Sequence, residues 1–167
     1  MTFLVDTNIC IGVLNDRSAA LTARWRTMRA SQIRLCSVVK AELWFGAMKS
    51  DKRERVEQAL IVFFARFRSM PFDDRAAVTY GELRATLESQ GAPIGPNDLL
   101  IAAIAKANDL VLVTHNTREF SRIAELALED WGRGVHDEGR ERVSRRSYFS
   151  AVCSIKLAAP SRRAASS

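Results

Sequence analysis

The stretch TFLVDTNICIGVL, residues 2–14, holds two apolar runs separated by only three polar residues. The first run, residues 3–5, is typical of a short buried strand, and the second, from Ile9 onward, is typical of a helix. Between them stands Asp6, where a solvated loop would usually carry glycine, proline or several charges. An isolated carboxylate next to a buried strand is unfavourable, so Asp6 is the first candidate functional residue.

Working outward from this stretch, strand-like and helix-like segments alternate as far as residue 131. The predicted strands are Thr2–Val5, Ile33–Ser37, Ser69–Phe72, Leu110–Thr114 and Leu126–Glu129. The predicted helices are Asn8–Leu14, Ser18–Met28 (with Asp16 or Ser18 as its cap), Val38–Met48, Arg53–Phe67, Arg75–Ser89 and Asn97–Ala107. Strands separated by helices predict an α/β layered domain with a largely parallel sheet. In such sheets ligands bind at the carboxyl ends of the strands.

Size and composition limit the classes of protein to which the chain can belong. The chain has 167 residues, of which 47% are hydrophobic and 26% charged, as in an ordinary soluble domain. No apolar run approaches the ~20 residues that a membrane-spanning helix needs. No secretion signal is visible, and three cysteines without a Cys-x-x-Cys pair fit a reducing compartment. We therefore expect a cytoplasmic protein with no membrane partner.

The net charge of +6 is concentrated at the C-terminal end. From Gly132 onward there are eight Lys or Arg residues and three acids, so residues 132–167 carry +5 and residues 1–131 only +1. Bulk charge therefore gives no reason to expect that the body of the protein binds nucleic acid. The Arg/Ser-rich residues 132–167 are expected to form a basic, poorly ordered extension. This extension is either a solvated appendage or a source of salt-sensitive affinity for nucleic acid.

Glu42 is a second acid at a position where a charge is expected to be unfavourable. It belongs to the predicted helix SVVKAELWFGAMK, residues 37–49, where helical spacing places apolar residues around it. These neighbours are Val38, Val39, Leu43, Phe45 and Gly46. Glu42 is thus expected in the middle of the stripe that faces the sheet. A carboxylate there must be coordinated, protonated or paired, and a buried salt bridge remains open.

Further polar residues occur at the ends of other predicted elements. Asp98 begins a helix that is apolar on nearly every face, where it or Asn97 could serve simply as the cap. The stiff loop GAPIGP before it would hold the start of that helix in a fixed place. Thr114 and Asn116 directly follow a predicted strand, with Glu119 a short step beyond.

If the strands are parallel, these residues converge at one edge of the sheet. Several carboxylates at close quarters raise one another's pKa, and a divalent cation removes that repulsion. Oxygen-only ligands suit Mg²⁺ or Mn²⁺ better than zinc. Such a cluster can activate a water molecule and stabilise the charge of an in-line attack on a phosphodiester. The hypothesis from the residues is that Asp6 interrupts the apolar run because it binds metal.

Four motifs carry a resemblance to a known family. LVDTNICIG, VVKAELWFGA, PIGPNDLLIAAIA and LVTHNTREFSRI with LALEDW resemble, in order and spacing, the PIN-domain ribonucleases, specifically the VapC toxins described as tRNA(fMet)-specific endonucleases. The resemblance covers residues 2–131, and the expected nuclease domain is residues 1–131. It implies a three-layer α/β/α sandwich and Mg²⁺-dependent cleavage of RNA, with initiator tRNA as the expected substrate and inhibition of translation as the result. It also implies neutralisation by a VapB antitoxin, and we expect a homodimer.

Carried over by motif, the resemblance implies a role for each candidate residue. Asp6 and Asp98 would be the principal metal ligands, and Glu42 would complete the acidic cluster. Asn116 stands where many PIN domains have aspartate, which weakens the case for a second metal, although Glu119 could compensate. Asn8 and Thr114 would be supporting polar residues. One firm Mg²⁺ site is therefore expected, with a two-metal mechanism left open.

Three alternatives bear on the function. A phosphohydrolase of the haloacid dehalogenase type needs a second aspartate two residues after the first, but position 8 is Asn. A metal-independent histidine nuclease needs an acid–base pair, but the only histidines are His115 and His136, and His115 is expected to orient a loop or meet substrate. A non-catalytic RNA-binding or regulatory module on the same fold is the alternative that stays open.

Overall fold

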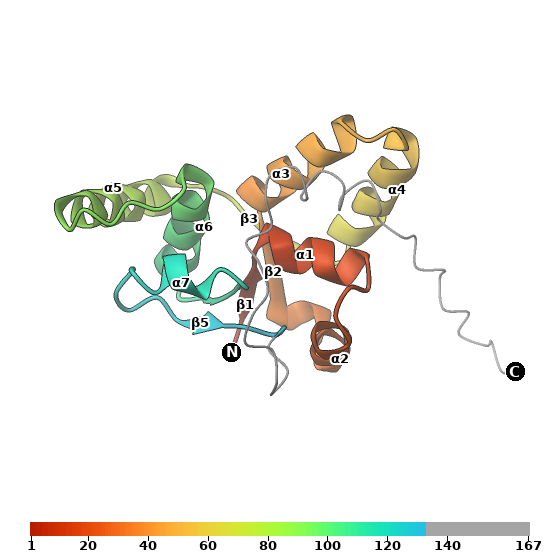
Figure 1. Ribbon diagram of the computed structural model, residues 1–167, viewed down its shortest axis with the longest axis horizontal. Coiled ribbons are helices and arrows are strands. Elements are labelled where there is room, and N and C mark those ends of the chain that lie inside the picture. Colours follow the sequence, from red (N-terminus) through yellow and green to blue (C-terminus); the bar gives the residue numbers. More distant parts are fainter. Residues whose placement is uncertain (133–167) are drawn as a thin grey trace, which may run out of the picture.

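The computed structural model describes residues 1–132, in which a central sheet lies between two layers of helices (Figure 1). The strands are β1 (Phe3–Val5), β2 (Ile33–Cys36), β3 (Arg68–Met70), β4 (Val111–Val113) and β5 (Leu128–Glu129). The helices are α1 (Thr7–Leu14), α2 (Ala19–Thr27), α3 (Ser37–Met48), α4 (Arg53–Phe64), α5 (Asp74–Ser89), α6 (Pro96–Ala107) and α7 (Thr117–Phe120), with a 3-10 turn at Ala30–Gln32. The predicted extension beyond Gly132 lies outside the described residues.

The sheet has the strand order β3-β2-β1-β4-β5, and each neighbouring pair is parallel. Phe3 of β1 is in register with Ile33 on one side and with Val111 on the other. Helices α1 to α4 lie on one side of the sheet and α5 to α7 on the other (Figure 1). The predicted α/β/α sandwich with a parallel sheet is therefore confirmed.

The strand order reverses direction between β1 and β4. The chain moves outward from β1 through β2 to β3, then returns past β1 to form β4 and β5. Connections that leave β1 and β4 consequently go to opposite faces of the sheet, and in open α/β sheets ligands bind in the crevice expected at the carboxyl ends of two such strands. This crevice is the expected position of a site.

The core follows from the apolar runs in the sequence. All residues of β1 and β4 are buried, as expected for strands covered on both faces. Helix α6 is buried along most of its length because alanines alternate with isoleucine and leucine, which allows close packing against the sheet and α5. None of the helices within residues 1–132 is long and apolar enough to cross a membrane.

An aromatic cluster holds the end of the described chain in place. Trp131 is buried, and its ring lies 5.2 Å from that of Phe3 and 6.2 Å from that of Trp25, centroid to centroid. Trp25 also packs against Phe63 and Phe67. The residues that follow β5 are therefore fixed against β1, α2 and α4.

The predicted elements overlap the observed ones but differ at several ends. The predicted strand Ser69–Phe72 is shifted relative to β3, and the predicted strand Leu126–Glu129 begins two residues before β5. Helix α4 and two short turns differ as well. Helix α4 ends at Phe64, before the predicted Phe67, because residues 65–67 form a turn that leads into β3. Helix α7 and the 3-10 turn at Ala30–Gln32 were not predicted from the sequence. Both are too short for a helical periodicity to appear in the sequence.

Candidate active site

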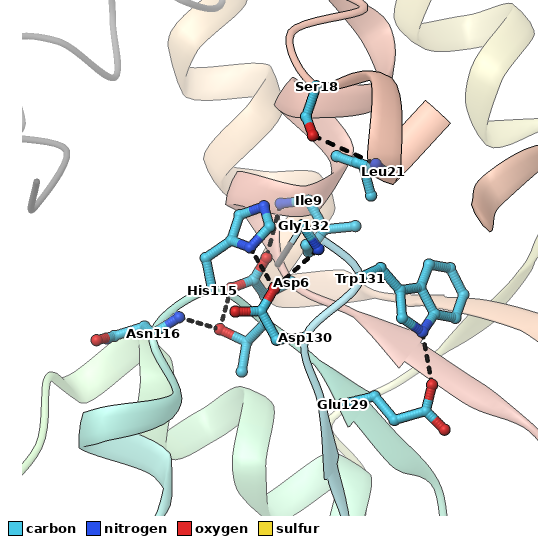
Figure 2. Close-up of polar contacts among 11 residues, drawn as sticks. Asp6, Ile9, Ser18, Leu21, His115, Asn116, Glu129, Asp130, Trp131 and Gly132 are labelled. Atoms are coloured by element: carbon cyan, nitrogen blue, oxygen red, sulfur yellow. Dashed lines mark hydrogen bonds and ion pairs between the residues drawn. The ribbon is translucent and has the colours of Figure 1, made fainter. Parts of the chain in front are cut away.

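Asp6 is the buried N-cap of α1. Its side chain is 4% exposed; Oδ1 accepts a hydrogen bond from the backbone N–H of Ile9 at 2.8 Å, and Oδ2 accepts one from Thr114 Oγ1 at 2.6 Å (Figure 2). Capping explains why an acid separates β1 from α1. Each carboxylate oxygen accepts only one of these bonds and keeps a further lone pair, so a cation can still be bound.

The end of β4 connects Asp6 with Asp98. Thr114 is fully buried, and its hydroxyl donates to Asp6 while accepting from the backbone N–H of Asn116 at 2.9 Å (Figure 2). The side-chain amide of Asn116 donates to Asp98 Oδ2 at 3.4 Å. Asn116 therefore acts here as a donor that orients Asp98, which an aspartate at this position would not do unless protonated.

Asp98 lies in the first turn of α6 but does not cap it. The N-cap is Gly95, Pro96 occupies the first helical position, and no side chain closes the helix start. The reading in which Asn97 or Asp98 serves simply as a cap is thus wrong. Neither side chain is engaged in capping, and the amide of Asn97 donates to Glu42 instead.

Glu42 reaches the crevice from α3, but its surroundings differ from the prediction. It is half-buried, and Phe45, expected on the buried stripe, is 52% exposed, so Glu42 lies at the edge of that stripe and not in its middle. Thr7 Oγ1 donates to Oε2, and Asn97 Nδ2 donates to Oε1 at 2.8 Å. Within residues 1–132 no cation pairs with Glu42, so the buried salt bridge is not observed.

The acids act on one another through their charges. Burial raises the pKa of Asp6 to about 6, with Glu42 adding to the rise, while the bonds from Thr114 and Ile9 oppose it. Burial likewise raises the pKa of Asp98 to about 7, and the charges of Asp6, Glu119 and Glu42 raise it further. Asp6, Glu42 and Glu119 therefore lie close enough for their charges to act on Asp98.

Two further residues predicted to support the site, Glu119 and Asn8, differ in their relation to the acids. Glu119, in α7, is half-buried and close enough to influence Asp98. Asn8, in the first turn of α1, is half-buried, and its side chain forms no hydrogen bond with another residue of the described segment. No local pattern indicated a role for Thr7, and the sequence suggested only a capping role for Asn97, although both directly adjoin predicted site residues.

The donor set fits a hard divalent cation. Within residues 1–132, no group of three or more His, Cys, Asp or Glu side chains is arranged so that it could hold a metal ion. Mg²⁺ does not need three such ligands, because it commonly binds through one or two carboxylates and retains waters or binds substrate phosphates. Asp6 and Asp98, both with raised pKa, offer that pair of carboxylates.

Replacing Thr114 by valine tests the link between β4 and Asp6. The substitution preserves shape but removes both the donor to Asp6 and the acceptor for Asn116 N–H. Because both groups are then unsatisfied next to the core, we expect the free energy of unfolding to fall by about 1–3 kcal/mol. Urea denaturation measures this, with the exposed Thr86→Val as the control. Equal stability of the two variants would contradict the role of Thr114.

Comparison with known proteins agrees with this geometry. The PIN domain family matches residues 3–126. "Ribonuclease VapC2" of Rickettsia felis is 39% identical over 132 residues, which make up 78% of this chain and 98% of that protein. The "tRNA(fMet)-specific endonuclease VapC" of Shigella flexneri is 38% identical over 131 residues, again 78% of this chain and 98% of that protein.

Solved structures agree with the same assignment. VapBC2 from Rickettsia felis, bound to a DNA fragment from its promoter, contains a chain with a TM-score of 0.73 and 38% identity, covering 78% of this chain and 99% of that one. DNA-bound VapBC from Salmonella typhimurium gives a TM-score of 0.74 at 36% identity, covering 78% and 98%.

The fold and the match over residues 3–126 show that the chain is a member of the PIN domain family. Within that family, the chain belongs to the VapC ribonucleases.

Proposed function

We propose that the crevice between β1 and β4 is the catalytic centre of a Mg²⁺-dependent endoribonuclease that cuts tRNA, with initiator tRNA as its target. As a member of the VapC ribonucleases, the chain is an endoribonuclease, a hydrolase of phosphodiester bonds, and the toxin of a type II toxin–antitoxin pair. The observation that carries the proposal is the convergence of Asp6, Glu42 and Asp98 from three separate segments.

PIN nucleases generally depend on a divalent metal, and the residues present suit Mg²⁺, with Mn²⁺ as a substitute. Asp6 and Asp98 would hold the cation, which supplies an activated water and stabilises negative charge on the phosphodiester. Glu42, with each carboxylate oxygen held by one donor, would use its remaining lone pairs to orient the attacking water.

Asn116 favours a single cation. Its amide carries no charge and donates to Asp98, so it holds that carboxylate in place without adding a ligand of its own. A second cation would have to rely on Glu119, the further acid that acts on Asp98. The proposal is therefore one Mg²⁺ site with catalytic roles for Asp6, Glu42, Asp98 and, through orientation, Asn116.

A VapB-type antitoxin is the proposed protein partner. The solved toxins with this fold are components of VapBC complexes, two of them bound to DNA. On this chain, Met48 of α3 and Ile61 and Val62 of α4 are 43%, 49% and 61% exposed. Exposed apolar side chains on one pair of packed helices suit a partner's apolar segment. We place the protein in the cytoplasm, where tRNA and an antitoxin are available.

A homodimer is the proposed assembly of the chain itself. Val78 of α5 is 64% exposed, and Phe72, which precedes that helix, is 37% exposed. In Figure 1 the pair α5 and α6 projects from the sheet on the side away from α3 and α4. A second copy bound at α5 would leave α3 and α4 open to an antitoxin.

The proposed nuclease domain is residues 1–131. The relatives match this part of the chain over 98% of their own length. Residues 132–167 carry +5 of the net charge. Their proposed contribution is limited to salt-sensitive, sequence-independent affinity for RNA.

Incubation of the purified chain with total tRNA tests the function. We expect a single cut in initiator tRNA when Mg²⁺ or Mn²⁺ is present and none in EDTA, with the cleaved ends mapped by primer extension. The Asp6→Asn protein is the control for contaminating nucleases. A wild-type protein that binds tRNA but never cuts it, with either metal supplied, would support the non-catalytic RNA-binding alternative instead.

A further inference from the structure

His115 lies beside the acids and has a carboxylate partner of its own. It directly follows Thr114, which donates to Asp6, and its Nδ1 lies 2.7 Å from Asp130 Oδ1 (Figure 2). The side chain of His115 is 39% exposed and that of Asp130 only 12%. A carboxylate that bonds one ring nitrogen fixes the orientation of the imidazole and leaves the other nitrogen directed away from it.

Gly132 lies against the Cε1 edge of the same ring. Its backbone N–H donates to Asp130 Oδ1 at 2.9 Å, the oxygen that also contacts His115. A Cβ atom at position 132 would stand 2.0 Å from Cε1 of His115, so a side chain there must displace the imidazole. The ring is thus held between a carboxylate and a backbone that approaches too closely for any residue but glycine.

The segment that positions the ring is itself rigid. Trp131, between Asp130 and Gly132, is buried against Phe3 and Trp25. Its indole Nε1 donates to Glu129 Oε2 at 2.7 Å. The arrangement is therefore set by core packing and β5, and the imidazole is fixed although it is partly open to solvent.

A hydrogen-bond donor beside the acids would add a contact with the RNA backbone. The acids of the site accept hydrogen bonds when ionised and then offer no donor to an RNA phosphate. Within residues 1–132, Nε2 of His115 has no protein partner. With a proton on each ring nitrogen, the side chain donates from Nδ1 to Asp130 and has Nε2 available to donate to a phosphate oxygen.

We propose that His115 is a further substrate-contacting residue of this site, which donates from Nε2 to a phosphate oxygen of bound RNA while Asp130 and Gly132 position its ring. The inference rests on the proposed function because it requires that RNA enter this crevice. It adds a binding contact to that function and leaves the metal-holding residues unchanged.

A pair of substitutions at His115 separates the substrate contact from a structural role. Asparagine places its amide where Nδ1 lies and can keep the bond to Asp130, but it offers nothing at the position of Nε2. Glutamine places its amide where Nε2 lies. We expect His115→Asn to weaken RNA binding and to lower kcat/KM by about tenfold or more, chiefly through KM. His115→Gln should lose about threefold or less, since it restores a neutral donor.

A substitution at Gly132 tests the positioning role. Gly132→Ala should reproduce the loss seen with His115→Asn, because the new methyl group displaces the ring. In the His115→Asn background, Gly132→Ala should lower kcat/KM little further, since the imidazole ring is already absent. The control is Gly81→Ala, where a Cβ meets nothing within 4 Å. Wild-type KM in Gly132→Ala would overturn the positioning role.

RNA binding measured by fluorescence anisotropy in EDTA separates this inference from the proposed cleavage. If the wild type cuts RNA and His115→Asn matches it in kcat/KM and in RNA affinity, the inference fails and the function stands. If the wild type never cuts but His115→Asn still weakens binding, the cleavage proposal fails and the contact stands. Equal losses in both His115 variants, with lowered stability in each, would show a structural role and overturn the inference.

Discussion

Asp98→Asn is expected to lower the rate of RNA cleavage by about 10²–10³-fold, the loss typical when one charge-stabilising group of a catalytic site is removed. The substitution keeps the shape of the side chain and removes the charge that would hold the cation. The donor from Asn116 can still be accepted by the new amide oxygen, so the local geometry is retained. Kinetics on a tRNA substrate at saturating Mg²⁺ measure the effect.

The matched control for this variant is Asp51→Asn, which removes one negative charge at an exposed turn far along the chain from the crevice. The Asp51→Asn protein should cleave at the wild-type rate, since only the net charge of the protein changes and no residue of the site is altered. Circular dichroism confirms that both variants are folded. Wild-type cleavage by a folded Asp98→Asn protein would contradict the role of Asp98 as a metal ligand.

Stability without metal is expected to fall as the pH rises from about 4 to about 8. In the unfolded chain Asp6 and Asp98 ionise near 3.8, but in the folded protein burial raises their pKa to about 6 and about 7. Below the pKa of the unfolded chain, Asp6 and Asp98 are protonated in both the folded and the unfolded state, so no stability is lost. Between the two values the unfolded state releases protons that the folded state retains, so folding becomes less favourable. The total loss is a few kcal/mol at most.

Two variants and one cation test this dependence. Asp6→Asn and Asp98→Asn should each flatten the decline, so that at pH 8 in EDTA Asp98→Asn is more stable than the wild type. Added Mg²⁺ should stabilise the wild type at pH 8 and have little effect on Asp98→Asn, because a ligand stabilises only the state that binds it. Urea denaturation at pH 5 and pH 8 provides the data, with Asp51→Asn again as control. A wild type that gains stability between pH 5 and pH 8 in EDTA would refute the prediction.

Much of the architecture could be predicted because it depends on short-range patterns. Apolar runs of three to five residues between helical segments predict parallel strands, and the observed β1 to β5 lie within or next to the predicted ranges. Asp6 and Asp98 were found because each stands at the boundary of a strongly apolar element. Such a boundary is visible in the order of residues alone.

The details of the site depend on contacts between distant residues. The bond from Thr114 to Asp6 spans 108 positions, and the bond from Asn97 to Glu42 spans 55. Helical spacing identifies the residues that share a face, but not the depth to which a face is covered. For that reason Glu42 was expected in the middle of a buried stripe and is found half-buried at its edge.

The order of residues alone indicates the alternation of elements, the parallel sheet and the two acids that would hold a cation. The contacts by which Thr7 and Asn97 secure Glu42, and by which Asp130 and Gly132 confine His115, exist only in the folded chain. These segments meet because the strand order reverses between β1 and β4. That order is set by the packing of helices on both faces of the sheet, which no local pattern of residues records.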